Sequence, residues 1–178
     1  MPDAKDKGKT KGYSLWLMPS GSVRAKMLRI IGRLAKDYCG PAFEPHVTLL
    51  GQFELKESEM LRITAELSEK LKSFRITLGK VECSEHHFRC LFVRAFETSE
   101  LMVANQKARE IFKRKGGPRY MPHLSLFYGR LPPKTKKELV SGMRDNFSGA
   151  VFETKTMRLM RTHGRPAEWR KVKNFRLG

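Results

Sequence analysis

The sequence predicts an α+β fold of two similar halves, in which antiparallel strands alternate with amphipathic helices. A short phrase occurs once in each half, as Pro45-His46-Val47-Thr48-Leu49 and as Pro122-His123-Leu124-Ser125-Leu126. Each copy alternates polar and aliphatic residues, which is typical of a strand with one buried face. Segments with apolar residues three or four apart separate the strands and predict helices. No linker divides the chain into independent domains.

The first half is predicted to contain a strand, a helix, the first motif strand and a second helix. These elements lie at about residues 13–18, 23–38, 46–53 and 60–71. Both helices are identified by apolar residues at helical spacing, and in the first of them lysine and arginine lie off the apolar face. Gly40 and Pro41 end the first helix, because neither residue favours its continuation.

The second half repeats this order after a predicted hairpin. The hairpin joins about residues 76–83 to 88–96, and a third helix follows at 101–112. The second motif strand lies at about 123–128 and a short fourth helix at 135–147. Two last strands lie at about 151–162 and 169–177. The segment Thr135-Lys136-Lys137-Glu138 predicts a capping box that opens the fourth helix.

Each copy of the repeated phrase offers an imidazole and a hydroxyl on one face of a strand. Successive side chains point to opposite faces, so His46 lies beside Thr48, and His123 lies beside Ser125. Two such strands facing each other would enclose an anion. A single His-x-Thr is most often an ordinary part of a strand, but a matched pair, each preceded by proline, indicates a functional site.

The paired histidines are suited to acid–base chemistry on a phosphate ester. Histidine has an unperturbed pKa near 6.5, so one imidazole can take a proton from water while the other protonates the leaving oxygen. Thr48 and Ser125 would hydrogen-bond the non-bridging phosphoryl oxygens. This chemistry needs no metal and no other cofactor.

At these residues the chain resembles the two-histidine phosphoesterases, which carry one His-x-Thr/Ser-x motif in each half. The resemblance is closest to the cyclic phosphodiesterase branch and covers about residues 12–177. Besides the motifs, it is carried by Ser14-Leu15-Trp16-Leu17-Met18-Pro19, Gly40-Pro41-Ala42-Phe43-Glu44-Pro45, Phe88-Arg89-Cys90-Leu91-Phe92 and Tyr120-Met121 with Phe127-Tyr128. It implies a bilobal, pseudo-two-fold fold with two antiparallel sheets facing across a central cleft and helices outside.

The resemblance also implies an activity. The reaction would be hydrolysis of a nucleoside 2′,3′-cyclic phosphate to a 2′-phosphate, or of ADP-ribose 1″,2″-cyclic phosphate to the 1″-phosphate. We assign His123 as base and His46 as acid, although the near-symmetry of the motifs leaves their order open.

Three aromatic residues match positions near the substrate in this branch: Trp16, Phe88 and Tyr128. Trp16 is out of phase with the apolar residues around it, so it is free to face the cleft. Regular alternation instead places Tyr128 on the face opposite His123 and Ser125, unless a bulge or twist intervenes.

Composition agrees with a single two-lobed domain over residues 12–178, preceded by a basic tail over residues 1–11 that we predict to be disordered. The hydrophobic content of 40% is ordinary, and no apolar run reaches the ~18 to 20 residues of a membrane span. We expect a monomer in the cytoplasm, with no membrane contact, and leave a nuclear location open.

Positive charge is the second informative feature, since 36 Lys+Arg against 18 Asp+Glu give a net charge of +18. Such a field attracts polyanions. The basic residues gather from position 155 onward, as Lys155, Arg158, Arg161, Arg165, Arg170, Lys171, Lys173 and Arg176. A second basic run, residues 113–119, leads directly into the second motif. We expect RNA contact through the basic C-terminal surface; the alternative is a charged surface that only maintains solubility.

The remaining histidines and cysteines point to no cofactor. Cys83, His86, His87 and Cys90 cluster, but their spacing does not match paired zinc ligands. A Cys83–Cys90 disulfide across the hairpin is conceivable, although free thiols are the simpler interpretation. His163 is interpreted as a loop residue.

Two alternative functions remain open on the sequence alone. The chain could process RNA ends, as a 2′-5′ phosphodiesterase or ligase-like enzyme or a 3′-end exonuclease, and its net charge of +18 favours that over a small nucleotide. It could also be an RNA-binding module without catalysis. The intact histidine and hydroxyl partners in both motifs count against the second alternative.

Overall fold

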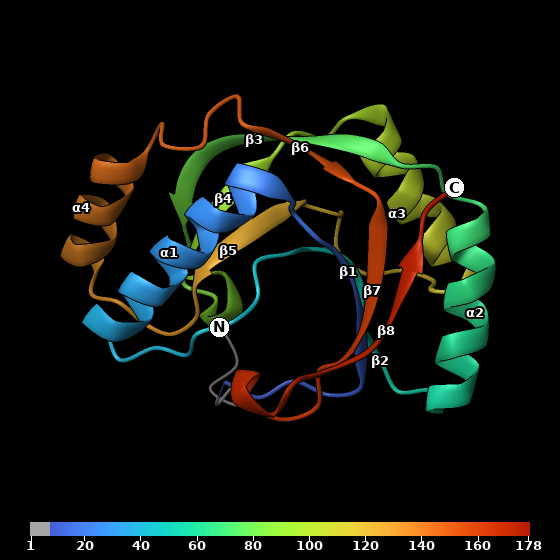
Figure 1. Cartoon of the computed structure of the whole chain (residues 1–178). Helices are drawn as coiled ribbons and strands as arrows, with labels where there is room; N and C mark the ends of the chain where they lie inside the picture. The colour runs from blue at the N-terminus through green and yellow to red at the C-terminus, as the bar shows by residue number, and fades with distance from the viewer. Residues whose placement is uncertain (1–7) are drawn as a thin grey trace.

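The computed structural model describes residues 8–178 and contains one strongly curved antiparallel sheet (Figure 1). Its strands are β1 (Tyr13–Leu17), β2 (Val47–Phe53), β3 (Phe74–Cys83), β4 (Leu91–Ala95), β5 (His123–Phe127), β6 (Val151–Thr154), β7 (Thr156–Arg161) and β8 (Arg170–Arg176). They follow the order β6-β3-β4-β5-β2-β1-β7-β8. The predicted α+β class is confirmed, and the two predicted sheets are the two halves of this one sheet.

The halves meet where the two motif strands lie edge to edge. β2 and β5 share one registered pair, Val47 with Leu124, whereas the other neighbouring strands pair over four residues or more. The four strands on one side of this β2–β5 seam are β2, β1, β7 and β8, and the four on the other side are β5, β4, β3 and β6. Both histidine motifs therefore lie at the centre of the sheet.

Four α-helices cover the outer face of the sheet. They are α1 (Gly21–Asp37), α2 (Glu57–Glu69), α3 (Ser99–Ile111) and α4 (Pro133–Met143). The helices exchange sides: α1 follows β1 but packs on β5, whereas α3 follows β4 but packs on β2. Figure 1 shows α1 and α4 beside β4 and β5, with α2 and α3 on the opposite side of the molecule.

Alternation along the motif strands divides their side chains between the two faces. Leu15, Leu17, Leu49 and Leu124 are fully buried within the main hydrophobic core. The segment after α1 approaches β5 so closely that a Cβ on Gly40 would lie 2.3 Å from the buried Phe127 ring and would displace it. The outer face is thus filled by helices, which leaves the concave face for the polar residues of the motifs.

Two predicted elements are corrected by the structure. The predicted strand 151–162 is two strands interrupted at Lys155: β6 pairs with β3, and β7 pairs with β1 on the far side of the sheet. The predicted capping box at Thr135 is also wrong, because α4 begins at Pro133 without a side-chain cap. Proline suits the first helical turn, where its missing N–H leaves no intrahelical bond unmade.

Residues 8–11, the first described residues, belong to the predicted tail. Thr10 pairs with Gly164 in the loop after β7, and Gly8 lies against the His87 ring. Residues 1–7 of that tail lie outside the described residues. Within residues 8–178, no helix combines the length and the apolar character that crossing a bilayer requires.

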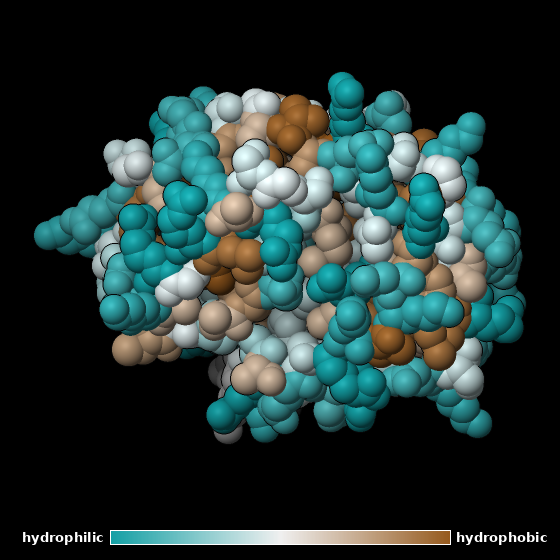
Figure 2. Space-filling model, viewed as in Figure 1, coloured by the Kyte–Doolittle hydropathy of each residue, from teal (hydrophilic) through white to brown (hydrophobic). Residues whose placement is uncertain are grey.

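The surface agrees with the high net charge. Figure 2 shows that hydrophilic side chains cover most of one face, with small, separate hydrophobic patches between them. Several of the basic residues from position 155 onward contact other side chains. Arg170 pairs with Glu57 of α2, Lys173 lies over the Phe175 ring, and Arg158 is partly buried on β7.

Candidate active site

The register of the β2–β5 seam brings the four motif residues together. Val47 and Leu124, which follow the two histidines, are paired in antiparallel orientation. This register forms a four-residue motif square with two facing pairs, His46 with Ser125 and Thr48 with His123. The two histidines occupy one diagonal, and diagonal neighbours across an antiparallel pair are about 7–8 Å apart. A phosphate group can therefore be contacted by both imidazoles from opposite corners.

Both imidazoles are oriented by the same backbone contact. The Nδ1–H of His46 donates to the carbonyl oxygen of Glu44 at 2.7 Å, and the Nδ1–H of His123 donates to that of Met121 at 2.8 Å. Because a carbonyl oxygen can only accept, the proton of each neutral ring lies on Nδ1. The Nε2 atom of each ring is left to exchange protons with a substrate.

Burial holds the His46 ring in its neutral form. Its exposed fraction is 6%, and desolvation is the main cause that lowers its pKa to about 3. The hydrogen bond to Glu44 opposes this shift, while the positive charges of His123 and Arg158 add to it. The influence of His123 is consistent with the proximity that the strand register implies.

The His123 ring is also held neutral. Desolvation lowers its pKa to about 4, against the opposing hydrogen bond to Met121, and the charges of Arg89, His86 and Arg94 lower it further. An anionic phosphate between the rings would raise both pKa values, because a nearby negative charge favours imidazolium. Such a site is set to bind an anion and to gain a proton with it.

The two hydroxyls of the motif square are not equivalent. The Ser125 hydroxyl donates to the Phe88 carbonyl oxygen at 2.9 Å. Among the described residues the Thr48 hydroxyl has no hydrogen-bond partner, whereas the Thr48 carbonyl accepts from the Tyr120 hydroxyl at 3.0 Å. Thr48 can therefore donate to a phosphoryl oxygen directly, while Ser125 must first rotate away from Phe88.

Trp16 supports an imidazole and is nearly inaccessible to solvent. Its ring stacks on His46 with centroids 3.5 Å apart and planes 3° apart, and its exposed fraction is 2%. Phe92 takes the related place in the other half, since it pairs with Ser125 and meets the His123 ring edge-on at 5.4 Å. Trp16 lies beside the motif square, but its stacked and nearly inaccessible ring leaves little surface for the substrate contact that the resemblance implies.

Phe88 and Tyr128 belong to an aromatic cluster at the His46–Ser125 end of the square, which we define as Phe43, Phe88, Tyr128 and Trp169. Tyr128 stacks on Phe43 at 3.7 Å and meets Phe88 edge-on at 5.3 Å. Burial raises the pKa of its hydroxyl above the usual value, and the influence of Ser125 opposes that shift. The alternation argument is therefore wrong for Tyr128, because β5 ends at Phe127 and strand periodicity no longer applies.

Trp169 is a member of this cluster that the sequence did not identify. It lies 5.8 Å from Trp16 and 5.9 Å from both Phe88 and Tyr128, measured between ring centroids. Its only sequence signal is that it is one of two tryptophans and stands in a basic segment.

Arg158, predicted as part of the basic C-terminal surface, lies in a row across the concave face. The register places Thr48, Trp16, Arg158 and Asn174 on four adjacent strands. The Arg158 Nε–H donates to the Asn174 side-chain oxygen at 2.9 Å. Strand pairing between distant segments creates this row, so no local pattern reveals it.

The Cys83–Cys90 region lacks a disulfide. All three cysteines are free thiols, with Cys83 exposed and Cys90 buried. Within residues 8–178, no group of three His, Cys, Asp or Glu residues is arranged to hold a metal ion. The 3₁₀ turn between these cysteines (His87–Arg89) carries Phe88 toward the motif square.

Comparison with known proteins agrees with this geometry. The model of the 2′-5′ RNA ligase superfamily matches residues 19–166. The chain belongs to this superfamily. The resemblance to two-histidine phosphoesterases, drawn from the two motifs, is thereby confirmed at the level of the family.

The chain is also similar to individual proteins. It is 28% identical over 153 residues to a cyclic phosphodiesterase of Arabidopsis thaliana, a match that covers 84% of each chain. Its fold is similar to that of Escherichia coli LigT in the apo form, with a TM-score of 0.63, 14% identity, and 95% of this chain and 98% of LigT covered. A Thermus thermophilus protein gives a TM-score of 0.65 at 18% identity, covering 93% and 97% of the two chains.

Proposed function

We propose that this protein is a metal-independent phosphoesterase that opens cyclic phosphates on ribose by two-histidine acid–base catalysis. The observation that carries the proposal is the motif square, in which two Nδ1-anchored imidazoles lie on one diagonal and two hydroxyls on the other. The substrates are nucleoside 2′,3′-cyclic phosphates, giving 2′-phosphates, or ADP-ribose 1″,2″-cyclic phosphate, giving the 1″-phosphate. The Arabidopsis relative, named a cyclic phosphodiesterase, supports this substrate class.

In the proposed mechanism, water attacks phosphorus while His123 Nε2 takes a proton from it. The phosphorus bond to O3′ breaks, and His46, which enters as imidazolium, gives its Nε2 proton to that oxygen. The product keeps its phosphate on O2′, and proton exchange with solvent restores both rings. Thr48 and Ser125 donate to the non-bridging oxygens, where negative charge develops in the transition state.

The surroundings of the square suggest how the nucleoside is held. The aromatic cluster offers flat apolar surfaces beside His46 and Ser125, suited to a base or ribose. Arg158, close enough to lower the pKa of His46, adds a positive charge that would attract the phosphate. Trp16 is proposed to position His46 through the stacked contact.

The first test is substitution of the motif residues, with chelator present throughout. His46→Ala and His123→Ala should each lower kcat with 2′,3′-cyclic mononucleotides by about 10² to 10⁴, because acid and base serve one transition state. Thr48→Val and Ser125→Ala should lower it by about 10- to 1,000-fold. Circular dichroism serves as the control for folding. Either histidine variant keeping more than about a tenth of wild-type turnover would remove that residue from the mechanism.

Leaving-group dependence separates the acid from the base. In a nitrophenyl phosphate ester, the nitrophenolate leaves without being protonated. A variant that lacks the catalytic acid should therefore regain activity on this substrate, whereas a variant that lacks the catalytic base should not. We expect rescue of His46→Ala and no rescue of His123→Ala. The opposite result would exchange the two roles, and rescue of neither variant would contradict acid catalysis by a histidine.

A second candidate function is processing of RNA ends by the same square. It is favoured by the net charge of +18, which exceeds what one small phosphate substrate requires. Rates on RNA bearing a cyclic phosphate or a 2′-5′ linkage, compared with rates on the two small substrates, distinguish these candidates. An inactive protein that still binds RNA would support the third alternative, a binding module.

A further inference from the structure

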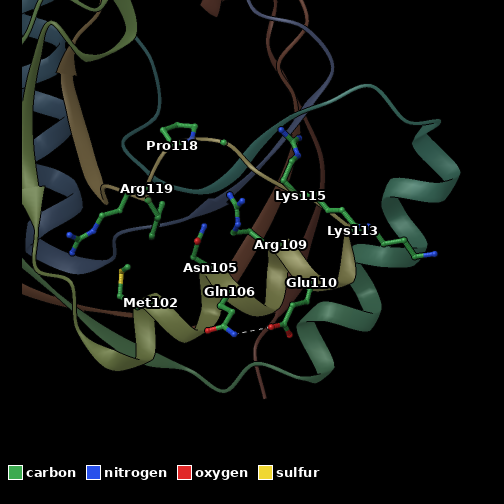
Figure 3. A pocket seen from close by; sticks show the side chains of 12 residues that line it. Met102, Asn105, Gln106, Arg109, Glu110, Lys113, Lys115, Pro118 and Arg119 are labelled. Carbon is green, nitrogen blue, oxygen red and sulfur yellow. Dashed lines mark hydrogen bonds between the residues drawn. The ribbon is translucent and has the colours of Figure 1, made fainter.

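The described chain contains a basic pocket away from the aromatic cluster. It has a volume of about 720 Å³ and lies between α3 and the loop over residues 113–120 (Figure 3). Its walls carry five basic residues, Arg109, Lys113, Arg114, Lys115 and Arg119, and one acid, Glu110. Figure 3 shows Asn105 and Arg109 rising from α3 toward the loop, with Glu110 hydrogen-bonded to Gln106.

Most of this charge is not neutralised within the pocket. Arg109 and Arg114 donate to backbone carbonyl oxygens, which orient the guanidinium groups and leave their net charge in place. Arg119 forms an ion pair with Glu97. The side chains of Lys113 and Lys115 form no hydrogen bond or ion pair with the described residues, and both residues are exposed. The pocket is therefore a concave surface with a strong preference for anions.

The wall of this pocket is joined to the motif square. Tyr120 lines the pocket and donates its hydroxyl to the carbonyl oxygen of Thr48. His123 follows Tyr120 by three residues. Because each residue spans at most ~3.6 Å, the Cα atoms of Tyr120 and His123 are at most about 11 Å apart. Thr48 and His123 form the end of the square opposite the aromatic cluster. A ligand that places one phosphate in the square can thus place a neighbouring phosphate in the pocket.

We propose that this pocket holds the phosphate on the 5′ side of the terminal nucleotide of a single-stranded RNA whose 3′-end cyclic phosphate lies in the motif square. The inference rests on the proposed function and narrows its substrate class to oligoribonucleotides. A mononucleotide would reach the square and the aromatic cluster but not the pocket. Asn105, whose amide donates to the Leu49 carbonyl oxygen at 2.7 Å, fixes the pocket floor to the motif strand β2.

The test uses the Lys113→Glu/Lys115→Glu variant, because these two side chains form no hydrogen bond or ion pair with the described residues. The control is Arg29→Glu/Arg33→Glu on α1, which makes the same change in net charge at two exposed positions. We expect kcat/KM for a five-nucleotide RNA with a 2′,3′-cyclic phosphate to fall by about tenfold or more in the pocket variant, since two positive charges that would attract the phosphate are reversed. A cyclic mononucleotide should change by no more than about twofold, and the control should affect both substrates alike. Equal losses on both substrates in the pocket variant, or no loss on the RNA, would overturn the proposal.

Binding without turnover separates failure of this inference from failure of the proposed function. In a His46→Ala background, a fluorescent RNA ending in a 3′-phosphate is titrated at several salt concentrations. The slope of log K against log [salt] should become less steep by about 0.7 for each phosphate that the pocket variant no longer neutralises. A changed slope in this background, together with no hydrolysis of any cyclic phosphate by the wild-type protein, would retain the pocket and reject the enzyme. Binding of polyglutamate as tight as that of RNA would overturn the pocket as an RNA subsite and indicate an acidic protein partner.

Discussion

At the scale of single residues, the most consequential feature is that both histidines of the motif square are desolvated and neutral, with His46 buried and His123 partly buried. The pKa is about 3 for His46 and about 4 for His123, with desolvation as the main cause in each case. The backbone carbonyl that accepts from Nδ1 keeps each ring in place without neutralising a charge. Stability and catalysis therefore depend on the same two groups.

This burial predicts a loss of stability in mild acid. Between the unfolded pKa near 6.5 and the folded values, the unfolded chain binds more protons, so the free energy of unfolding decreases as pH falls. Each ring should account for roughly 2 kcal/mol between pH 7 and pH 5. The loss of stability is measured by urea unfolding of the wild type, His46→Asn and His123→Asn at both pH values. The variants should lose less stability than wild type, and parallel losses in all three proteins would contradict the burial argument.

The four motif residues could be identified from the sequence because each pair of histidine and hydroxyl is local in the chain and occurs twice. Arg158 and Trp169 could not, because β7 and the loop before β8 reach the square only through strand pairing across the sheet. Tyr128 was misplaced by a rule that holds only inside a strand. Long-range register carries the information that local periodicity lacks.

At the scale of elements, the β2–β5 seam is the contact on which the square depends. With a single registered strand pair, side chains supply further bonds to β2, from Tyr120 to the Thr48 carbonyl and from Asn105 to the Leu49 carbonyl. These two side-chain bonds satisfy the carbonyl oxygens of Thr48 and Leu49 in the region where β2 and β5 pair at one position only. The seam is therefore stabilised by side chains that also line the basic pocket.

Tyr120→Phe should weaken this seam. Loss of the hydroxyl leaves the Thr48 carbonyl without that partner and should lower the free energy of unfolding by about 1–3 kcal/mol. Because Thr48 and His123 adjoin the bond, kcat should fall more than KM rises. Thermal melts and steady-state kinetics measure both effects, with Tyr38→Phe, at a more exposed tyrosine, as control. Wild-type stability with wild-type kcat in Tyr120→Phe would show that the seam does not need this bond.

Element types were largely predictable, whereas element ends and partners were less so. Apolar spacing located all four helices, but α4 begins at Pro133 because proline fits a first turn better than the Thr135 cap that its neighbours suggested. The break at Lys155 has no local signal, since residues on both sides favour strands. It is required because β6 and β7 belong to opposite ends of the sheet.

At the scale of the whole molecule, the exchange of α1 and α3 couples the two halves of the sheet. Each half is covered by a helix that follows a strand of the other half, and the core is continuous from Leu78 in β3 to Leu159 in β7. Neither half can bury its apolar face alone. The fold should therefore unfold as one unit.

Matched core substitutions test this coupling. Leu78→Ala and Leu159→Ala each create a cavity at a fully buried position and should destabilise the protein by about 2–5 kcal/mol. We expect each variant to shift a single transition, with far-UV and near-UV circular dichroism coincident. A biphasic curve in which only one variant moves the first phase would indicate two independently stable lobes.

The strand order has a consequence for synthesis on the ribosome. All four motif residues have been incorporated once Ser125 is added, yet β1 gains its second neighbour only when β7, ending at Arg161, follows. Until then, the strand that presses Trp16 against His46 has an open edge. A nascent chain stalled in α4 would carry every catalytic group without a working site and would offer that edge to chaperones or to other chains.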